Sequence, residues 1–418
     1  MRTILCAALL AACGGQDLGE KALRNAGDDL IVSWAASGNE TDPNAALGAQ
    51  FGSSVATNGN WIAVARQPAS AADVARVEVW QRSGTGWAHN MSWSVATWSS
   101  HAPGHRAVVA MSPGRLLIGE PCISNAPGCV GYFEIFELFH GNLWALRAGD
   151  TCDNPASWDC GTAVAVSDTD WAITSGGVVS WYKYEDTDFN FPLQAAFTEP
   201  STVYLDSGFG SSIAMTNHGV AVAAPNGSPF PIHKGVSQRS PGYVYVFGPG
   251  ATDVTRLTGV GTQGATGGPG FGGSISTSQD GLTLAVGAGT EVGRFMTAYV
   301  FHENAATNTW GKPTVIAPPT GATGSDIRVA IDGGLLGVTT GNGSTGTASF
   351  FSFSGGLLGS AQLNASFALD YPRAPIDLRS GRAIVGQPDF LGSAGYIATY
   401  AGTQPVIAVN PPVGALNP

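Results

Sequence analysis

Charged residues are scarce in this sequence: they occupy 12% of the 418 positions, and only five residues are methionine. Amphipathic surface helices depend on charged side chains, so this scarcity argues against a helical bundle or a coiled coil. The 30 acidic residues outnumber the 19 basic ones and no basic run occurs, which argues against binding to nucleic acid. Beyond the N-terminus, no hydrophobic stretch approaches the roughly 18 residues of a membrane-spanning helix.

Sequence motifs for catalysis and for cofactor binding are also missing. There is no G-x-S-x-G elbow, no H-E-x-x-H and no P-loop. His101 and His105 have a zinc-like spacing, but the Pro-Gly between them indicates a loop. The acidic segments 168–170 and 186–190 supply too few oxygen ligands for a calcium loop. We therefore predict no metal site and no cofactor.

The residues that are abundant indicate a β protein with many turns. The sequence has 58 glycines and 25 prolines, and its 44% of apolar residues can bury a large core. A chain of this length forms either two or three ordinary domains or one large closed β architecture. The apolar and aromatic residues are spread evenly along the chain, which favours the second arrangement.

The N-terminus predicts export and lipid attachment. Arg2 precedes an apolar stretch that is too short to span a bilayer, as in a signal peptide. Leu10-Ala11-Ala12-Cys13 resembles the lipobox of bacterial lipoproteins, in which cleavage before the cysteine frees it for lipid attachment. We expect a signal peptide over 1–12, a lipidated Cys13 and a tether over 13–29. The lipid alone would hold the protein in the bacterial cell envelope, at the outer membrane or the cell surface. An ordinary signal peptide cleaved nearby is the alternative.

The remaining cysteines predict disulfide bonds. Cys6 would leave with the signal peptide and Cys13 would carry the lipid, which leaves an even set suited to an oxidising compartment. That set is Cys122, Cys129, Cys152 and Cys160. Two local bridges, 122–129 and 152–160, are the economical pairing, and each would close a small loop. Crossed pairings stay open.

A repeated pattern organises the rest of the chain. FGSSVATNGNWIAVARQ at residue 51 returns as FGSSIAMTNHGVAVAAP at 209 and FGGSISTSQDGLTLAVGA at 271. Weaker copies fill the gaps, so seven units begin near 51, 105, 160, 209, 271, 325 and 372. Each unit has a first strand of small residues, a tight turn, an apolar second strand, an aromatic third strand and a more polar fourth strand. This predicts one four-stranded antiparallel sheet per unit.

Seven such sheets predict a seven-bladed β-propeller over residues 30–410, followed by a tail over 411–418. A four-stranded sheet with two apolar faces is unstable alone, and stacking the sheets around an axis buries both faces. Small residues recur in the first strand because seven of these strands converge on the axis. The last blade could be completed by Leu30–Trp34 or by Val406–Val409. We expect an all-β monomer.

Two short motifs recur at fixed places in these units. Phe-Gly pairs stand at 51–52, 209–210 and 271–272, and Gly-Ala-Pro-like segments stand at 119–121, 223–225, 287–288 and 386–388. These motifs resemble FG-GAP repeats, the units of the integrin α-chain propeller and of many bacterial envelope proteins. The resemblance covers about 47–409 and implies a binding role. Four copies replace Phe-Gly, with His105-Arg106, Cys160-Gly161, Ser325-Asp326 and Pro372-Arg373.

The longest insertion is a candidate recognition loop. In a propeller, the connections between second and third strands and those between blades emerge on one face, where ligands usually bind. The insertion Pro225–Pro241 belongs to this face and brings aromatic, basic and amide residues to an otherwise acidic protein. Its candidate binding residues are Phe230, His233, Lys234, Gln238 and Arg239. A tolerated surface insertion is the alternative.

The predicted function is non-enzymatic binding of a protein or glycan partner on this loop face, in adhesion or envelope assembly. Fold alone does not define function, so this prediction depends on the resemblance and on the missing catalytic motifs. The rival is an enzyme with its site at the axial channel, for which Asp206, Asp326 and Asp377 are the candidate carboxylates. A structural subunit of a larger complex, with an apolar patch on its surface, is a third possibility.

Overall fold

The structure is a computed structural model. It describes residues 33–41, 50–68, 73–94, 106–122, 130–152, 159–185, 191–200, 207–225, 242–250, 253–259, 270–289, 296–317, 326–342, 345–353, 360–388 and 395–403. The regular elements of these segments are all β-strands. Within the same segments, no helix is long and apolar enough to cross a membrane.

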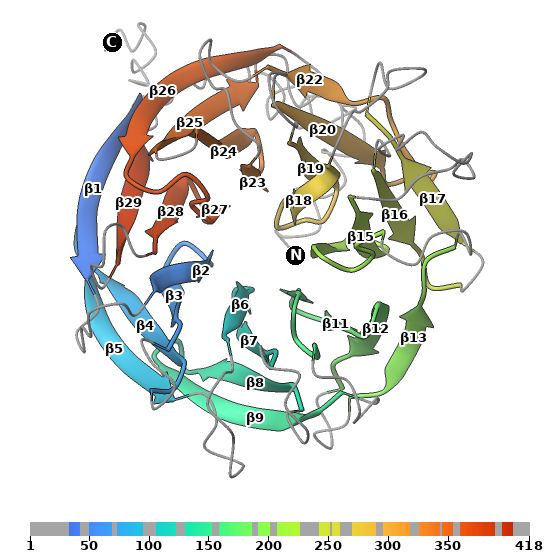
Figure 1. Cartoon of the computed structure of the whole chain (residues 1–418), viewed down its shortest axis with the longest axis horizontal. Coiled ribbons are helices and arrows are strands. Elements are labelled where there is room, and N and C mark those ends of the chain that lie inside the picture. Colours follow the sequence, from blue (N-terminus) through green and yellow to red (C-terminus); the bar gives the residue numbers. More distant parts are fainter. Residues whose placement is uncertain are drawn as a thin grey trace, which may run out of the picture.

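The strands form seven antiparallel sheets arranged as blades around a central axis (Figure 1). Blade 1 consists of β2 (Phe51–Thr57), β3 (Trp61–Arg66), β4 (Arg76–Ser83) and β5 (Gly86–Ser94). Blade 2 consists of β6 (Val108–Met111), β7 (Arg115–Glu120), β8 (Tyr132–Phe139) and β9 (Leu143–Thr151). Blade 3 consists of β10 (Val164–Val166), β11 (Asp170–Ser175), β12 (Val178–Lys183) and β13 (Leu193–Phe197). Blades 4 and 5 consist of β14 (Ile213–Thr216), β15 (Gly219–Ala224), β16 (Tyr243–Phe247) and β17 (Val254–Leu257); and β18 (Phe271–Thr277), β19 (Thr283–Ala288), β20 (Thr297–Asn304), β21 (Thr309–Trp310) and β22 (Thr314–Ile316). Blades 6 and 7 consist of β23 (Ile327–Asp332), β24 (Leu335–Asn342), β25 (Thr345–Phe353) and β26 (Ala361–Leu369); and β27 (Ile376–Arg379), β28 (Arg382–Gln387), β29 (Tyr396–Thr403) and β1 (Ser33–Thr41). The predicted seven-bladed propeller is confirmed, with one short extra strand, β21, in blade 5.

The N-terminal strand closes the ring. β1 pairs antiparallel with β29 and forms the outer strand of blade 7, so the two ends of the described chain meet in one sheet (Figure 1). β1 overlaps the expected segment 30–34 only at residues 33 and 34 and continues to Thr41. A rim strand can be polar because its backbone hydrogen bonds do not depend on an apolar sequence, which is why the apolar pattern did not indicate the extension of this strand to Thr41. Residues 30–32 and the competing segment 406–409 lie outside the described residues.

The hydrophobic core is divided among the seams between blades. Seven clusters of buried apolar side chains occur, and each combines residues from two neighbouring blades. At the seam of blades 1 and 2, for example, the rings of Trp61 and Trp144 meet edge to face at 5.7 Å. None of these clusters of described residues is confined to one blade, so each blade is stabilised by its neighbours.

The Phe-Gly and Gly-Ala-Pro motifs meet across these seams. Phe51 is completely buried, and Gly52 has a φ of +90°, a left-handed conformation that favours glycine. A Cβ on Gly52 would lie 2.9 Å from the carbonyl oxygen of Tyr396 and 3.0 Å from the backbone nitrogen of Gln387, both in blade 7. The Phe-Gly of one blade therefore packs on the Gly-Ala-Pro-like segment of the preceding blade.

Serine side chains in the inner strands link successive blades. The backbone N–H of Val109 donates to Ser54 Oγ at 3.1 Å, and that of Ile275 donates to Ser212 Oγ at 3.2 Å. The same bond joins Val329 N–H to Ser274 Oγ at 3.2 Å. The small residues of the first strand thus relieve crowding at the axis and also satisfy backbone donors of the next blade.

A disulfide joins blades 2 and 3. Cys152 and Cys160 are bonded, with their Cα atoms 5.8 Å apart, and both are buried at this seam. Cys160 occupies the position that Phe51 holds in the first copy. Cys122 is disulfide-bonded as well. Cys129, the partner expected for Cys122, lies outside the described residues.

Candidate functional site

The first strands of all seven blades surround an axial cavity of about 540 Å³. The pairing of first and second strands shows which residues are equivalent around it. One equivalent ring that lines the cavity is Ser54, Val108, Ala163, Ser212, Ser274, Arg328 and Pro375. Arg328 is the one charged member of this ring. Its long side chain stands where the other blades carry small or apolar residues.

The two faces of the propeller differ in their connections. We call loop face the face on which the first strands begin, because it carries the connections between second and third strands and between blades. These connections include 67–75, 121–131 and 225–242. The opposite face carries tight turns between first and second strands, such as 217–218 and 333–334.

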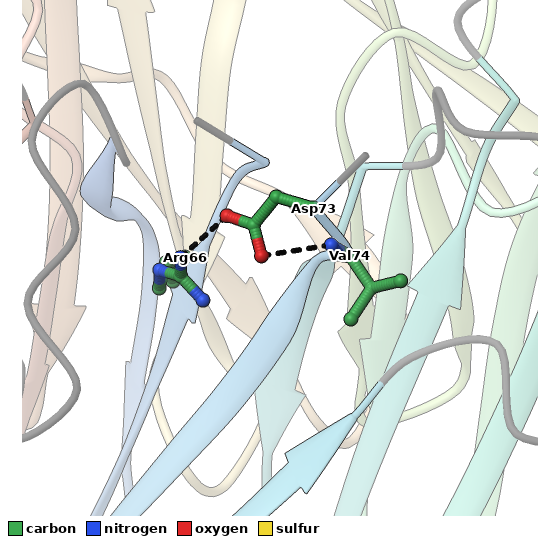
Figure 2. A network of polar contacts seen from close by, with 3 residues as sticks. All are labelled: Arg66, Asp73 and Val74. Carbon is green, nitrogen blue, oxygen red and sulfur yellow. Dashed lines mark hydrogen bonds and ion pairs between the residues drawn. The ribbon is translucent and has the colours of Figure 1, made fainter. Parts of the chain in front are cut away.

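One connection of the loop face is anchored by a buried arginine. Arg66, at the end of β3, forms an ion pair with Asp73 in the connection 67–75, and its side chain is only 3% exposed (Figure 2). The second oxygen of Asp73 accepts a hydrogen bond from the backbone N–H of Val74 at 2.9 Å. This contact fixes the chain at the point where it enters β4.

Three arginines line the cavity where it opens on the loop face. We call this opening the channel mouth and define it by Arg106, Arg328, Arg373, Tyr371 and Asp326. Arg373 Nε donates to Asp326 Oδ2 at 2.9 Å, and its side chain is 62% exposed. Arg106 is exposed. Among the residues that the structure describes, its guanidinium has no hydrogen-bond or ion-pair partner.

Arg328 is the most enclosed of the three arginines. Its Nη1 donates to the carbonyl oxygen of Gly273 in blade 5 at 2.9 Å. Burial lowers the pKa of Arg328, and neighbouring Arg373 lowers it further, whereas Asp326 and Tyr371 raise it. A guanidinium still keeps its charge under ordinary conditions. The described residues of the mouth therefore include three positive groups and one carboxylate, in a protein of net charge −11.

Charged groups at the other end of the channel are held by backbone groups. Asp377 Oδ2 accepts from the N–H of Thr57 in blade 1 at 2.7 Å, and its Oδ1 accepts from Leu378 N–H at 2.9 Å. Burial raises the pKa of Asp377, although Arg379 and these two hydrogen bonds partly oppose the rise. Arg379 Nη1 donates to Ile331 O at 2.9 Å. These contacts join blade 7 to both of its neighbours.

The two candidate catalytic carboxylates that the structure describes do not converge. Asp326 precedes β23 and lies at the mouth, whereas Asp377 contacts Thr57, the last residue of β2, near the opposite end. Asp206 lies outside the described residues.

The predicted recognition loop and lipid site belong to the part of the chain outside the described residues. Residues 226–241, which include Phe230, His233, Lys234, Gln238 and Arg239, lie outside the described residues, as do Cys13, His101 and His105. Within the described segments, no group of three or more His, Cys, Asp or Glu side chains could hold a metal. Asp170, from one of the weak acidic segments, instead accepts a hydrogen bond from Trp181 Nε1 at 3.2 Å.

Other buried carboxyl groups include Glu78 and Glu134. Glu134 accepts from Trp93 Nε1 at 2.5 Å, and burial raises its pKa, while hydrogen bonds from Glu120 and Trp93 partly lower it. Glu78 lies at the equivalent position of blade 1, where it contacts His89 Nε2 and Ser92 Oγ at 2.8 Å each. Glu78 and Glu134 are at most 3% exposed. A substrate could not reach them, so we assign them to the stability of the fold.

Sequence reasoning missed the arginines of the mouth, although a signal for them exists. Three copies of the repeat have neither the phenylalanine nor the glycine of the Phe-Gly pair. In these copies the position of the glycine is occupied by Arg106, Asp326 and Arg373. Arg328 likewise breaks the pattern of small residues at Ser54, Ser212 and Ser274. The residues of the mouth could thus have been found as charged residues at positions where other copies of the repeat have glycine or serine.

Comparisons with known proteins establish the fold alone. The sequence matches no protein-family model and no curated protein. Among solved structures, a Bacteroides fragilis protein assigned provisionally as a 6-phosphogluconolactonase is similar with a TM-score of 0.50 and 10% identity, over 82% of this chain and 96% of that one. The propeller domain of the Trilobed protease from Pyrococcus furiosus has a TM-score of 0.49 and 10% identity, over 85% and 97% of the two chains. The propeller domain of Cps50 (Swd1) from Myceliophteria thermophila has a TM-score of 0.48 and 12% identity, over 87% of this chain and 100% of that one. The protein is a seven-bladed β-propeller.

Proposed function

We propose that this propeller is a lipid-anchored protein of the bacterial cell envelope that binds a protein or glycan partner on its loop face and catalyses no reaction. One observation carries the proposal: the same face has both the long connections and the three arginines of the channel mouth. Exposed arginines are frequent anchors of binding sites, and loops on a rigid scaffold commonly bind ligands. The opposite face has tight turns between first and second strands, and its longer connections, such as 184–192, join third and fourth strands.

The proposal also places the protein with FG-GAP-type propellers. Support comes from the seams, where Gly52 packs on segment 386–388 of blade 7 and Gly161 packs equally closely on residues 119 and 120 of blade 2. This contact gives a physical reason for both motifs to recur with the same phase. The leader sequence and Cys13 supply the expectation of a lipid anchor.

An enzyme at the axial channel is the rival. Catalysis by paired carboxyl groups needs both of them within reach of one substrate. The raised pKa of Asp377 is the one feature that favours this rival. Asp377 and Asp326 lie towards different ends of the channel, and each is engaged by a protein group, which favours the binding function.

Partner capture tests the proposed function. The purified protein and a variant with residues 226–240 replaced by a short Gly-Ser turn would be immobilised and exposed to an envelope extract. The control variant is His218→Gly, which leaves an Asn-Gly turn at 217–218 on the opposite face. Bound material would be identified and its binding repeated with the purified component, after thermal unfolding shows that all three proteins are folded.

We expect the parent and the control to capture the same component and the loop variant to lose it. Capture that survives the loop replacement would place the partner elsewhere and contradict the recognition loop. If no folded protein captures a component, the binding function fails, and the axial-channel enzyme becomes the better hypothesis.

A further inference from the structure

The channel mouth has the chemistry of an anion site. The Arg328 guanidinium donates one of its five N–H groups to Gly273 O. The Arg106 guanidinium donates none of its N–H groups to the described residues. Arg373 forms an ion pair with Asp326, the one carboxylate among the residues that define the mouth. Guanidinium groups bind carboxylates and phosphates through paired, charge-assisted hydrogen bonds. Positive charge gathered at a cavity opening also attracts anions from solution.

The wall around these arginines suits the hydroxyl groups of a sugar. Neutral polar residues with exposed side chains line the same cavity, namely Gln50, Thr162 and Ser211. Hydroxyl and amide groups can both donate and accept hydrogen bonds, as sugar hydroxyls do. Tyr371 also lines the cavity, and an aromatic residue there can offer an apolar surface. The volume of about 540 Å³ lies within the range of small-molecule sites.

We propose that the channel mouth binds an acidic sugar, whose carboxylate or phosphate is held by Arg106, Arg328 and Arg373 while its hydroxyl groups contact the polar wall. This inference rests on the proposed binding function and names its ligand class: a free sugar acid or phosphate, or an acidic residue of a glycan partner. Arg328 anchors the anion because Gly273 already orients its guanidinium. Arg106 adds a second, exposed contact.

Direct binding to the purified protein tests this proposal. The probes are glucuronate, glucose 6-phosphate, inorganic phosphate and glucose, each titrated by calorimetry at low and at high salt. We expect one or both acidic sugars to bind, glucose to bind at least about tenfold more weakly, and the affinity for the charged sugar to fall with salt. Comparing glucuronate with glucose 6-phosphate distinguishes a carboxylate from a phosphate.

Variants identify the groups responsible. Arg106→Gln should weaken binding of the acidic sugar about tenfold, since a charge-assisted contact is lost from an exposed side chain without other partners among the described residues. Arg328→Gln should weaken it further, and Arg328→Lys should restore part of the affinity. Arg82→Gln removes an exposed arginine near the opposite face and is the matched control. Thermal unfolding midpoints check that every variant is folded.

Each remaining outcome decides against the proposal or part of it. Equal binding of glucose and of the acidic sugars would remove the role of the arginines. Inorganic phosphate that binds as tightly as glucose 6-phosphate would remove the role of the polar wall. If a partner is captured through residues 226–240 but no anion binds, this inference fails while the proposed function stands. If an acidic sugar binds but no partner is captured, this inference stands while the proposed partner-binding function fails.

Discussion

Both ends of the axial channel carry arginine and aspartate, yet the groups have different surroundings. Near the end away from the loop face, Asp377 and Arg379 bond to backbone groups of blades 1 and 6. At the mouth, Arg106 is exposed and Arg373 pairs with a single carboxylate. Charges whose donors and acceptors are satisfied by neighbouring blades stabilise the ring, whereas charges that face solvent remain available to a ligand.

The comparison shows that residues which depart from the repeat pattern can serve different purposes, either joining blades or lining the channel. Asp377 joins blade 7, where the ring closes, to blade 1 in the way that Ser54, Ser212 and Ser274 join other blades. Arg328 replaces one of these serines and turns the same ring of positions into a cationic wall. Substitutions of Asp377 and Arg106 should therefore separate stability from binding, whereas Arg328 also donates to the backbone of blade 5 and contributes to both.

The largest loss of stability is expected from Asp377→Ala. The N–H groups of Thr57 and Leu378 would lose their acceptor in an enclosed place, which should lower the free energy of unfolding by about 2–3 kcal/mol. Urea denaturation measures the change. Asp377→Asn keeps one acceptor oxygen and should cost less. An alanine variant as stable as the parent would show that this carboxyl does not hold the closing seam.

A smaller loss is expected from Asp332→Ala. Asp332 Oδ1 accepts from Gln279 N–H at 3.3 Å and Oδ2 accepts from Ser380 N–H at 2.7 Å, so the side chain bridges blades 5, 6 and 7. Its partial exposure limits the cost to about 1 kcal/mol, because water can replace the lost acceptor. Asp168→Ala, in an exposed turn of blade 3, is the control and should change stability less.

The pH dependence of stability should sharpen the same comparison. Burial raises the folded pKa of Asp377 above the ordinary value of 3.8. The folded protein therefore keeps this proton at pH values where the unfolded chain has lost it, and stability falls as the pH rises through the folded pKa. Asp377→Asn should flatten this part of the curve. An unchanged slope would assign the effect to other carboxyl groups, such as Glu134.

The smallest change in stability is expected from Arg106→Gln. The side chain is exposed and has no partner among the described residues, so the free energy of unfolding should change by less than about 0.5 kcal/mol. Anion binding at the mouth should nevertheless weaken, as measured by calorimetry. A variant that lost stability and kept binding would reverse the roles assigned to the two ends.

Much of the architecture follows from the sequence because each blade repeats the same local pattern. The apolar run Trp61–Val64 lies within β3, and the alternating aromatic and aliphatic residues at 243–247 form β16. The closing strand was harder to locate, since much of β1 is small or polar and its pairing with β29 is made by the backbone. Its position depends on the ring and not on a local pattern.

The sequence by itself determined that this chain forms four-stranded antiparallel units and that seven of them occur, because strand periodicity and turn residues are local properties. Only the tertiary structure decided which side chains meet at the axis. Arg106, Arg328 and Arg373 belong to three different blades, and ring closure brings them to one opening. The same closure brings Asp377 to Thr57, which is 320 residues away in the chain. Contacts of this kind depend on the geometry of the whole ring, which no single unit encodes.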